Sequence, residues 1–221
     1  MPHDTEFYGP EQRSFQDAFD SRKLADRVAD MIVNCELDEA ATGFIATRDF
    51  MFLASVDGHG QPTVSYKGGA PGFVQVIDPS TLEFPSYDGN GMFLSLGNIA
   101  GTGNIGLLFI DFEKPHRLRV QATAKVRTAT AADKARWPGA QLVVSAKVRE
   151  VFPNCPRYIH KQRRESPSPY VPDAAGHAPT PDWKRIDALQ DALPEKDKGC
   201  AKAAGGTLTP QEYMERATGG E

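Results

Sequence analysis

Hydrophobic residues near the start of the chain recur at the three- to five-residue spacing of amphipathic helices. Between Phe15 and about Thr47 no proline interrupts this spacing, so the segment is predicted to be helical. A further short helix is predicted from Asp38 to Thr47, because acidic Asp38 and Glu39 suit the positive end of a helix. The spacing is carried by Phe15, Phe19, Leu24, Val28, Met31 and Ile32.

From Phe50 the pattern changes to the alternation of β-strands. The run 57–60 is a turn signal, and it predicts a hairpin between strands 50–56 and 61–67. Further strands are predicted at 73–77, 81–84, 105–112, 118–126 and 141–152, with a short helix at 129–136. About seven strands in this region indicate a mainly β protein with flanking helices, closed or sandwiched and antiparallel.

Composition divides the 221 residues into three segments. We expect a helical segment at 1–47, a β domain at 48–165, and a proline-rich arm at 166–221 with a short helix near 182–192. Trp183 gives that helix an apolar anchor, which needs a surface to pack on. The surface is either the chain's own β domain or a partner subunit, and the sequence leaves both open.

The loop from Phe84 to Ile99 interrupts the strands with glycine and polar residues and opens a short helix. Glycine gives the backbone freedom to turn, and the free N–H groups at a helix start favour an anion such as phosphate. Lysine supplies a charge for phosphate, while hydroxyl and amide groups supply hydrogen-bond donors. The candidate residues are Ser65, Tyr66, Lys67, Gly89, Asn90, Ser95 and Asn98.

Charge and hydropathy exclude several classes of partner. The net charge is −4 and the pI is about 5.8, so we expect no general affinity for nucleic acid or anionic membranes. No apolar run is long enough to span a bilayer, and residues 1–6 do not resemble a signal peptide. We therefore expect a soluble, cytoplasmic protein.

The chain lacks the common catalytic and metal-binding motifs. Glycines at 101, 103 and 106 match a dinucleotide-binding pattern, but the match precedes a strand where that motif should open a helix. The five histidines have no ligand spacing, so no metal site is expected. The three cysteines are predicted to be reduced thiols. Cys155, between prolines 153 and 156, is either redox-active or structural.

Several motifs in order resemble the pyridoxamine 5′-phosphate oxidase-like family of FMN-binding split β-barrel proteins, and one bacterial branch of predicted flavin-nucleotide-binding proteins in particular. The resemblance covers about residues 44–165. The matching segments are 52–62, 65–73, Phe84-Pro85, Gly89-Asn90, Asn98-Ile99, 106–109, Leu118-Arg119-Val120 and Asn154-Cys155-Pro156-Arg157.

This resemblance implies an antiparallel split β-barrel that forms a homodimer with two FMN molecules at the subunit interface. It implies that the strand with Lys67 lies along the flavin and that Phe84-Pro85 meets the ring or the ribityl chain. It places Gly89-Asn90 at the phosphate, and Arg119 near the cofactor or the interface. The implied activity is that of an FMN-dependent oxidoreductase acting on a small substrate, with the flavin carrying the electrons.

The sequence departs from the family in two places. Many relatives carry an arginine directly after the Gly-Asn pair, where this chain has Gly91-Met92. The arginine- and tryptophan-rich terminal signature of genuine pyridoxamine phosphate oxidases is not recognisable. Three alternatives to the oxidoreductase stay open: a flavin-nucleotide carrier or sensor without turnover, an F420-dependent reductase, and a haem-handling protein.

Overall fold

The computed structural model describes residues 7–218, and its chain contacts divide it into two units that meet between Pro167 and Ser168. Residues 1–6, considered above for a signal peptide and included in the predicted helical segment, lie outside the described residues. So do residues 219–221, which end the predicted arm.

The N-terminal segment contains three helices, α1 (Pro10–Ala18), α2 (Arg22–Ile32) and α3 (Glu39–Ala46). Helix is confirmed here, but it is interrupted after α1, where Asp20 has a left-handed backbone (φ +49°). The amide of Ser21 donates to the Gln16 carbonyl at 2.8 Å. This bond, next to a left-handed residue, is typical of the Schellman motif that ends a helix. As predicted, Asp38 begins the third helix, and its carboxylate accepts a hydrogen bond from the Ala41 amide at 2.7 Å.

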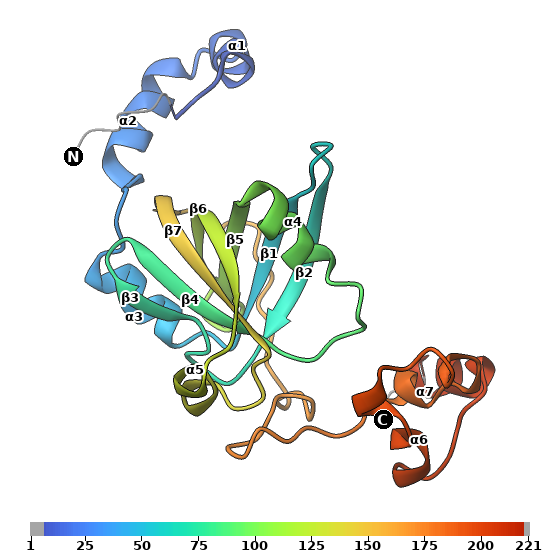
Figure 1. Cartoon of the computed structure of the whole chain (residues 1–221). Helices are drawn as coiled ribbons and strands as arrows, with labels where there is room; N and C mark the ends of the chain where they lie inside the picture. The colour runs from blue at the N-terminus through green and yellow to red at the C-terminus, as the bar shows by residue number, and fades with distance from the viewer. Residues whose placement is uncertain (1–6, 219–221) are drawn as a thin grey trace. The chain divides into compact units, whose positions relative to one another are not determined.

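Seven antiparallel strands form a single sheet in the order β2-β1-β5-β6-β7-β4-β3 (Figure 1). The strands are β1 (Phe50–Val56), β2 (Pro62–Gly68), β3 (Gln75–Asp78), β4 (Thr81–Ser86), β5 (Asn104–Asp111), β6 (His116–Thr128) and β7 (Leu142–Pro153). The sheet curls strongly, but no pairing joins β2 to β3. This open, curled sheet confirms the split β-barrel that the family resemblance implied, whereas the strand pattern alone had indicated a closed or sandwiched architecture.

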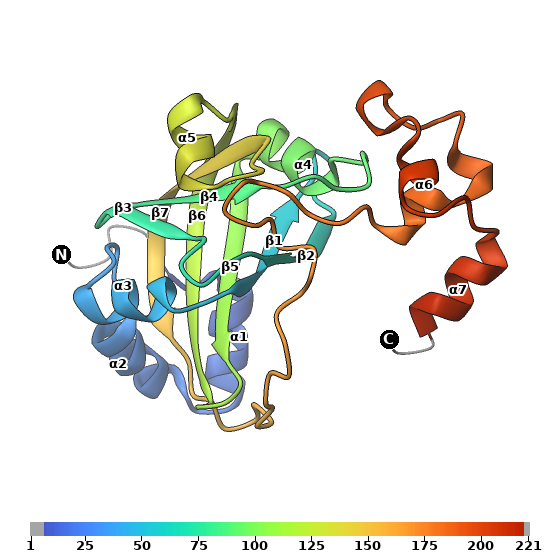
Figure 2. The ribbon, with the colours of Figure 1, turned by 90° about the horizontal axis from the view of Figure 1, so that it is seen from below.

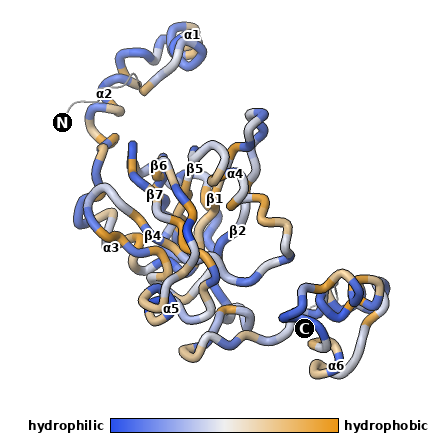
Figure 3. Tube along the Cα trace, viewed as in Figure 1, coloured by the Kyte–Doolittle hydropathy of each residue, from blue (hydrophilic) through white to orange (hydrophobic). Residues whose placement is uncertain are grey.

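The main core lies inside the curl, beneath α3 and α4 (Leu94–Thr102) (Figure 2). Along β1, Met51, Leu53 and Ser55 point into this core, while the residues between them face out. The hydropathy of the chain follows the same division, with apolar segments in the strands and polar segments in the loops (Figure 3). The predicted helix at 129–136 is α5 (Ala131–Arg136), begun by a capping box between Thr130 and Asp133.

The glycines at 101, 103 and 106 have no dinucleotide-binding geometry. Gly103 ends α4 in a left-handed conformation (φ +71°), and Gly106 lies within β5. A Cβ at Gly103 would meet the Ala124 carbonyl at 3.3 Å, which explains the glycine by backbone packing.

No helix within residues 7–218 is both long and apolar enough to cross a membrane.

The second unit has a small core of its own, where we expected a polar arm. The segment near 182–192 forms two 3₁₀ helices, Asp182–Arg185 and Asp187–Leu189, separated by Ile186, which pairs with Leu208. Two further short helices, α6 (Cys200–Ala203) and α7 (Pro210–Thr218), complete it, together with a 3₁₀ turn at Glu195–Asp197. Lys184 is buried and pairs with Asp197 at 2.9 Å, so ion pairs replace much of the apolar core that the composition lacks.

Candidate functional site

The tripeptide Ser65-Tyr66-Lys67 lies on β2, an edge strand, and its side chains go to opposite faces. Ser65 and Lys67 point to the core side of the sheet, opposite Leu53 and Met51 of β1. Tyr66 points outward, opposite Phe52. The structure therefore separates Tyr66 from the other two predicted site residues, as the two-residue period of a strand requires.

A hydrogen bond joins β2 to the first turn of α4. The hydroxyl oxygens of Ser65 and Ser95 lie 2.8 Å apart, and Ser95 is buried. Lys67 follows Ser65 on the same face, about 7 Å further along the strand. This places the lysine on the face of β2 that α4 covers.

Asn98 is buried on α4 and holds the helix to the sheet. Its side-chain amide donates to the Ser55 hydroxyl at 3.2 Å and to the Thr63 hydroxyl at 3.1 Å. Those two hydroxyls also bond each other at 3.1 Å. The donors of Asn98 are thus used inside the protein, so its role in this structure is to position α4.

The loop before α4 is exposed and shaped by its own backbone. The Asn90 carbonyl oxygen accepts a hydrogen bond from the Met92 amide at 3.1 Å. Gly91 and Phe93 both have left-handed backbones, with φ of +79° and +50°. An arginine at position 91 would be strained in this conformation, which gives a physical reason for the glycine.

No side chain caps the N-terminus of α4. The first N–H groups of a helix have no partner within the helix, and together with the helix dipole they attract anions. The fold therefore leaves the start of α4 able to accept an anionic group. Neighbouring Gly89 is exposed, and a Cβ there would meet nothing within 4 Å.

Lys67 is a partly buried cation without a counter-ion. Its side chain makes no hydrogen bond or ion pair with any residue in the described part of the chain. Burial lowers the pKa of its ammonium group, because removal from water disfavours the charged form. An anion beside Lys67 would compensate for this loss of hydration.

Phe84 and Pro85 lie in the interior. Phe84 is 1% exposed and belongs to the main core, and Pro85 is also buried. In the β4–β7 ladder, Phe84 lies opposite Val144 and Pro85 lies opposite Val143. Phe84 is therefore a core residue in this structure.

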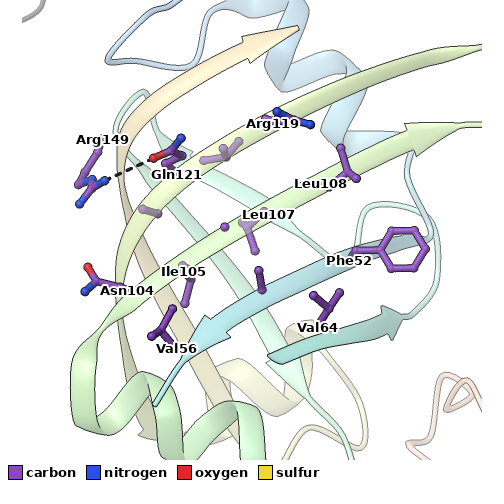
Figure 4. Close-up of a pocket in the computed structure, with 14 residues that line it drawn as sticks. Phe52, Val56, Val64, Asn104, Ile105, Leu107, Leu108, Arg119, Gln121 and Arg149 are labelled. Atoms are coloured by element: carbon purple, nitrogen blue, oxygen red, sulfur yellow. Dashed lines mark hydrogen bonds between the residues drawn. The ribbon is translucent and has the colours of Figure 1, made fainter. Parts of the chain in front are cut away.

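Arg119 lies on the outer face of the sheet, away from Ser65 and Lys67. There it lines a shallow depression of about 540 Å³ with Phe52, Val64 and Leu108 (Figure 4). Arg119 has no hydrogen-bond or ion-pair partner among residues 7–218. Nearby, Arg149 donates to the Gln121 side chain at 3.4 Å.

The outer face carries exposed apolar side chains that the sequence analysis did not single out. Val64 and Tyr66 on β2 are 69% and 64% exposed. The Tyr66 ring stacks on Phe50, with centroids 5.4 Å apart, and Phe50 stacks on Phe112 at 5.8 Å. The sequence of β1 indicates this outer patch, because the strand is apolar on both faces and such strands are usually buried on both.

The structure thus brings together Ser65, Lys67, Ser95 and the start of α4. It puts Tyr66 and Arg119 on the opposite face, and it uses Asn98 and Phe84 for packing. Within residues 7–218 no three histidine, cysteine, aspartate or glutamate side chains cluster as metal ligands would.

A family model described as pyridoxamine 5′-phosphate oxidase matches residues 37–162, more than half of the chain. No curated protein matches the sequence. The match includes every strand and α3, α4 and α5, and with them each predicted site residue.

Several solved structures are similar to part of the chain. A protein from Lactobacillus delbrueckii, provisionally assigned as a pyridoxamine 5′-phosphate oxidase, is 27% identical, with a TM-score of 0.43 over 54% of this chain and 95% of that one. HupZ of Group A Streptococcus is 22% identical, with a TM-score of 0.44 over 53% and 93%. An FMN-binding protein from Syntrophomonas wolfei is 14% identical, with a TM-score of 0.40 over 64% and 97%.

Proposed function

Since the chain belongs to the pyridoxamine 5′-phosphate oxidase family, we propose that it binds FMN and acts as an oxidoreductase on a small substrate. The observation that carries the proposal is Lys67. It is a partly buried cation with no side-chain partner among residues 7–218, on the strand face that Ser65 and Ser95 join to α4. The uncapped start of α4 adds backbone donors.

These residues fit a phosphate group. Lys67 supplies the charge, and the N–H groups of α4 supply the dipole. Since one hydroxyl of the Ser65–Ser95 pair donates to the other, the second hydroxyl keeps its hydrogen for the phosphate. No arginine follows Asn90, so Lys67 is the cation on which this fit depends. We therefore expect phosphate affinity to depend strongly on that one side chain.

The isoalloxazine of bound FMN would supply the electron chemistry. The protein's own part is to hold the phosphate at Lys67, to keep Ser65 and Ser95 in position, and to exclude water. The apolar residues of the sheet would exclude water from the flavin.

A homodimer is part of the proposal. On the outer face of the sheet, Val64 and Tyr66 are exposed beside half-buried Phe52 and Leu108, and monomeric proteins seldom leave such an apolar patch in water. A second copy on this face would bury it and would place Arg119 at the interface.

The visible spectrum of the purified protein tests the flavin. We expect the protein to copurify with FMN or to bind it on titration, with the fluorescence of the ligand quenched. Riboflavin, which lacks the phosphate, should bind at least tenfold more weakly. A colourless protein that takes up no FMN contradicts the proposal.

Turnover separates the enzyme from a carrier. With reduced nicotinamide cofactor and an electron acceptor, an oxidoreductase should exceed the rate of free FMN, whereas a carrier should not. Competition between FMN and F420 for the purified protein separates an FMN protein from an F420-dependent one.

A further inference from the structure

Helices α1 and α2 form a hairpin that exposes an apolar stripe. Phe15 and Phe19 lie one helical turn apart at the end of α1, and Leu24, Val28 and Met31 follow one face of α2. Phe19 is 78% exposed and Met31 is 75% exposed. Five large apolar side chains in one hairpin are more than scattered surface residues, and they indicate an interaction surface.

The shape of the hairpin is fixed by contacts that leave the stripe uncovered. Arg13 of α1 pairs with Asp26 of α2 at 2.5 Å. The Tyr8 hydroxyl donates to the Ala25 carbonyl at 3.1 Å. The ion pair joins α1 to α2, and the Tyr8 bond ties the segment before α1 to α2. Neither contact involves the apolar side chains of the stripe.

The hairpin is anchored beside the outer face of the sheet. Ala29 and Val33 pack on Phe152 of β7, and Asn34 exchanges backbone hydrogen bonds with Val151 at 2.9 and 2.8 Å. Phe152 pairs directly with Arg119 and so lies on the same face. The hairpin therefore flanks the apolar face on its β7 side.

The charges of the hairpin argue against a membrane or nucleic acid as its partner. Either of those would favour a basic surface. Here both signs are mixed around the stripe, which suits a protein surface that carries both signs as well. The basic residues are Arg13, Arg22, Lys23 and Arg27, and the acidic ones are Glu11, Asp17, Asp20, Asp26 and Asp30.

We propose that the stripe covers a second copy of this chain, so that each hairpin clasps the opposite subunit. The inference rests on the dimer in the proposed function and adds a contact to it. The proposal places the two-fold axis along the strands, because that arrangement brings the β7 side of one sheet over the β2 side of the other. The hairpin then lies on Val64 and Tyr66, the most exposed apolar residues of the partner's sheet face.

Sedimentation analysis of dimer dissociation tests the clasp. The double variant Phe19→Gln with Met31→Gln should raise the dissociation constant at least tenfold, while circular dichroism shows unchanged helix content. Matched controls are Ile77→Gln and Met214→Gln, which remove exposed apolar side chains elsewhere and should change nothing. The change Val64→Lys should break the dimer through the sheet face itself.

Cross-linking gives a second measurement. The three native cysteines are first replaced by serine, and then a protein with Met31→Cys is mixed with one that carries Val64→Cys. A disulfide between the two proteins is expected, since neither has a second cysteine.

The results separate the clasp from the dimer. If Val64→Lys dissociates the dimer but the hairpin variant does not and no disulfide forms, the clasp is wrong and the dimer stands. A wild-type protein that stays monomeric yet binds FMN overturns the dimer and the clasp, and leaves the flavin proposal intact.

Discussion

The hydroxyl oxygens of Ser65 and Ser95 lie 2.8 Å apart, and they join edge strand β2 to the first turn of α4. Two segments separated by 30 residues in sequence are thereby held in one position. Because this contact fixes the start of α4 against β2, we expect the proposed phosphate site to need little reordering when a ligand binds.

Replacement of Lys67 should weaken FMN far more than riboflavin. We expect Lys67→Met to reduce FMN affinity by tenfold or more, with riboflavin affinity nearly unchanged, because only FMN carries the phosphate. Fluorescence titration measures both. Lys125→Met, on an exposed strand position, is the control. If the affinities for FMN and riboflavin fall equally, Lys67 does not contact the phosphate.

FMN affinity should also fall at alkaline pH. Burial holds the pKa of Lys67 below its ordinary value of 10.5, and the phosphate binds the charged form. Affinity is therefore full at neutral pH and is lost as the pH rises through that lowered pKa. Titrations that extend from pH 7 past the ordinary lysine pKa of 10.5 should show the loss in the wild type and not in Lys67→Met. A wild-type affinity that stays constant over this range contradicts the assignment.

Asn98→Ala should destabilise the protein by about 2 kcal/mol. The change removes two buried hydrogen bonds, although Ser55 and Thr63 still bond each other. Chemical denaturation of the flavin-free protein measures the loss. Asn104→Ala, an exposed position, should change stability by less than about 0.5 kcal/mol. If Asn98→Ala alters only FMN affinity, the asparagine is a ligand contact.

Phe84→Ala should cost about 3–5 kcal/mol without any flavin present, as large-to-small changes in a core do. The same denaturation experiment measures it. The exposed aromatic Tyr158 provides the control Tyr158→Ala, which should have little effect. If the flavin-free variant is as stable as the wild type but no longer binds FMN, Phe84 contacts the cofactor.

Asp133 should make the protein sensitive to acid. Hydrogen bonds from Arg127 and Thr130 hold the pKa of its carboxyl well below the usual range. A carboxyl with a lowered folded-state pKa stabilises the protein above the unfolded pKa of about 4, and that contribution is lost as the pH falls further.

Asp133→Asn should therefore lower the melting temperature at pH 7 and bring the curves of variant and wild type together in acid. Thermal melts between pH 2 and 7 measure this. Asp30→Asn changes an exposed helix carboxylate and serves as the control. Parallel curves at all pH values would exclude Asp133 as the source.

Strands and helices could be predicted because their signals are local. Turn residues at 57–60 and alternation in β1 and β2 predicted the first hairpin, and acidic Asp38 predicted the start of α3. The separation of Tyr66 from Lys67 could also have been predicted, since neighbouring residues on a strand face opposite ways.

The partners of buried polar groups could not be predicted in the same way. Asn98 bonds Ser55 and Thr63, which lie 43 and 35 residues away, and only the folded sheet brings them together. Lys184 and Asp197 form a buried pair in a segment whose composition indicates a polar arm. Both sets of contacts join residues that are distant in sequence, and the local sequence pattern does not indicate which distant residues meet.

The gap in the sheet between β2 and β3 leaves each of these strands with one unpaired edge, and such edges invite other chains to add a strand. At β3, the shift in register between Val76 and Asp78 disrupts the edge. At β2, Pro62 lacks an N–H group and Lys67 adds a charge, and both features disfavour the addition of a strand. We therefore expect the ammonium group of Lys67 to oppose the addition of a strand at this edge as well. Lys67→Met removes this protection while Lys67→Arg keeps it, so aggregation during expression should follow the charge at position 67 even in protein that never meets a flavin.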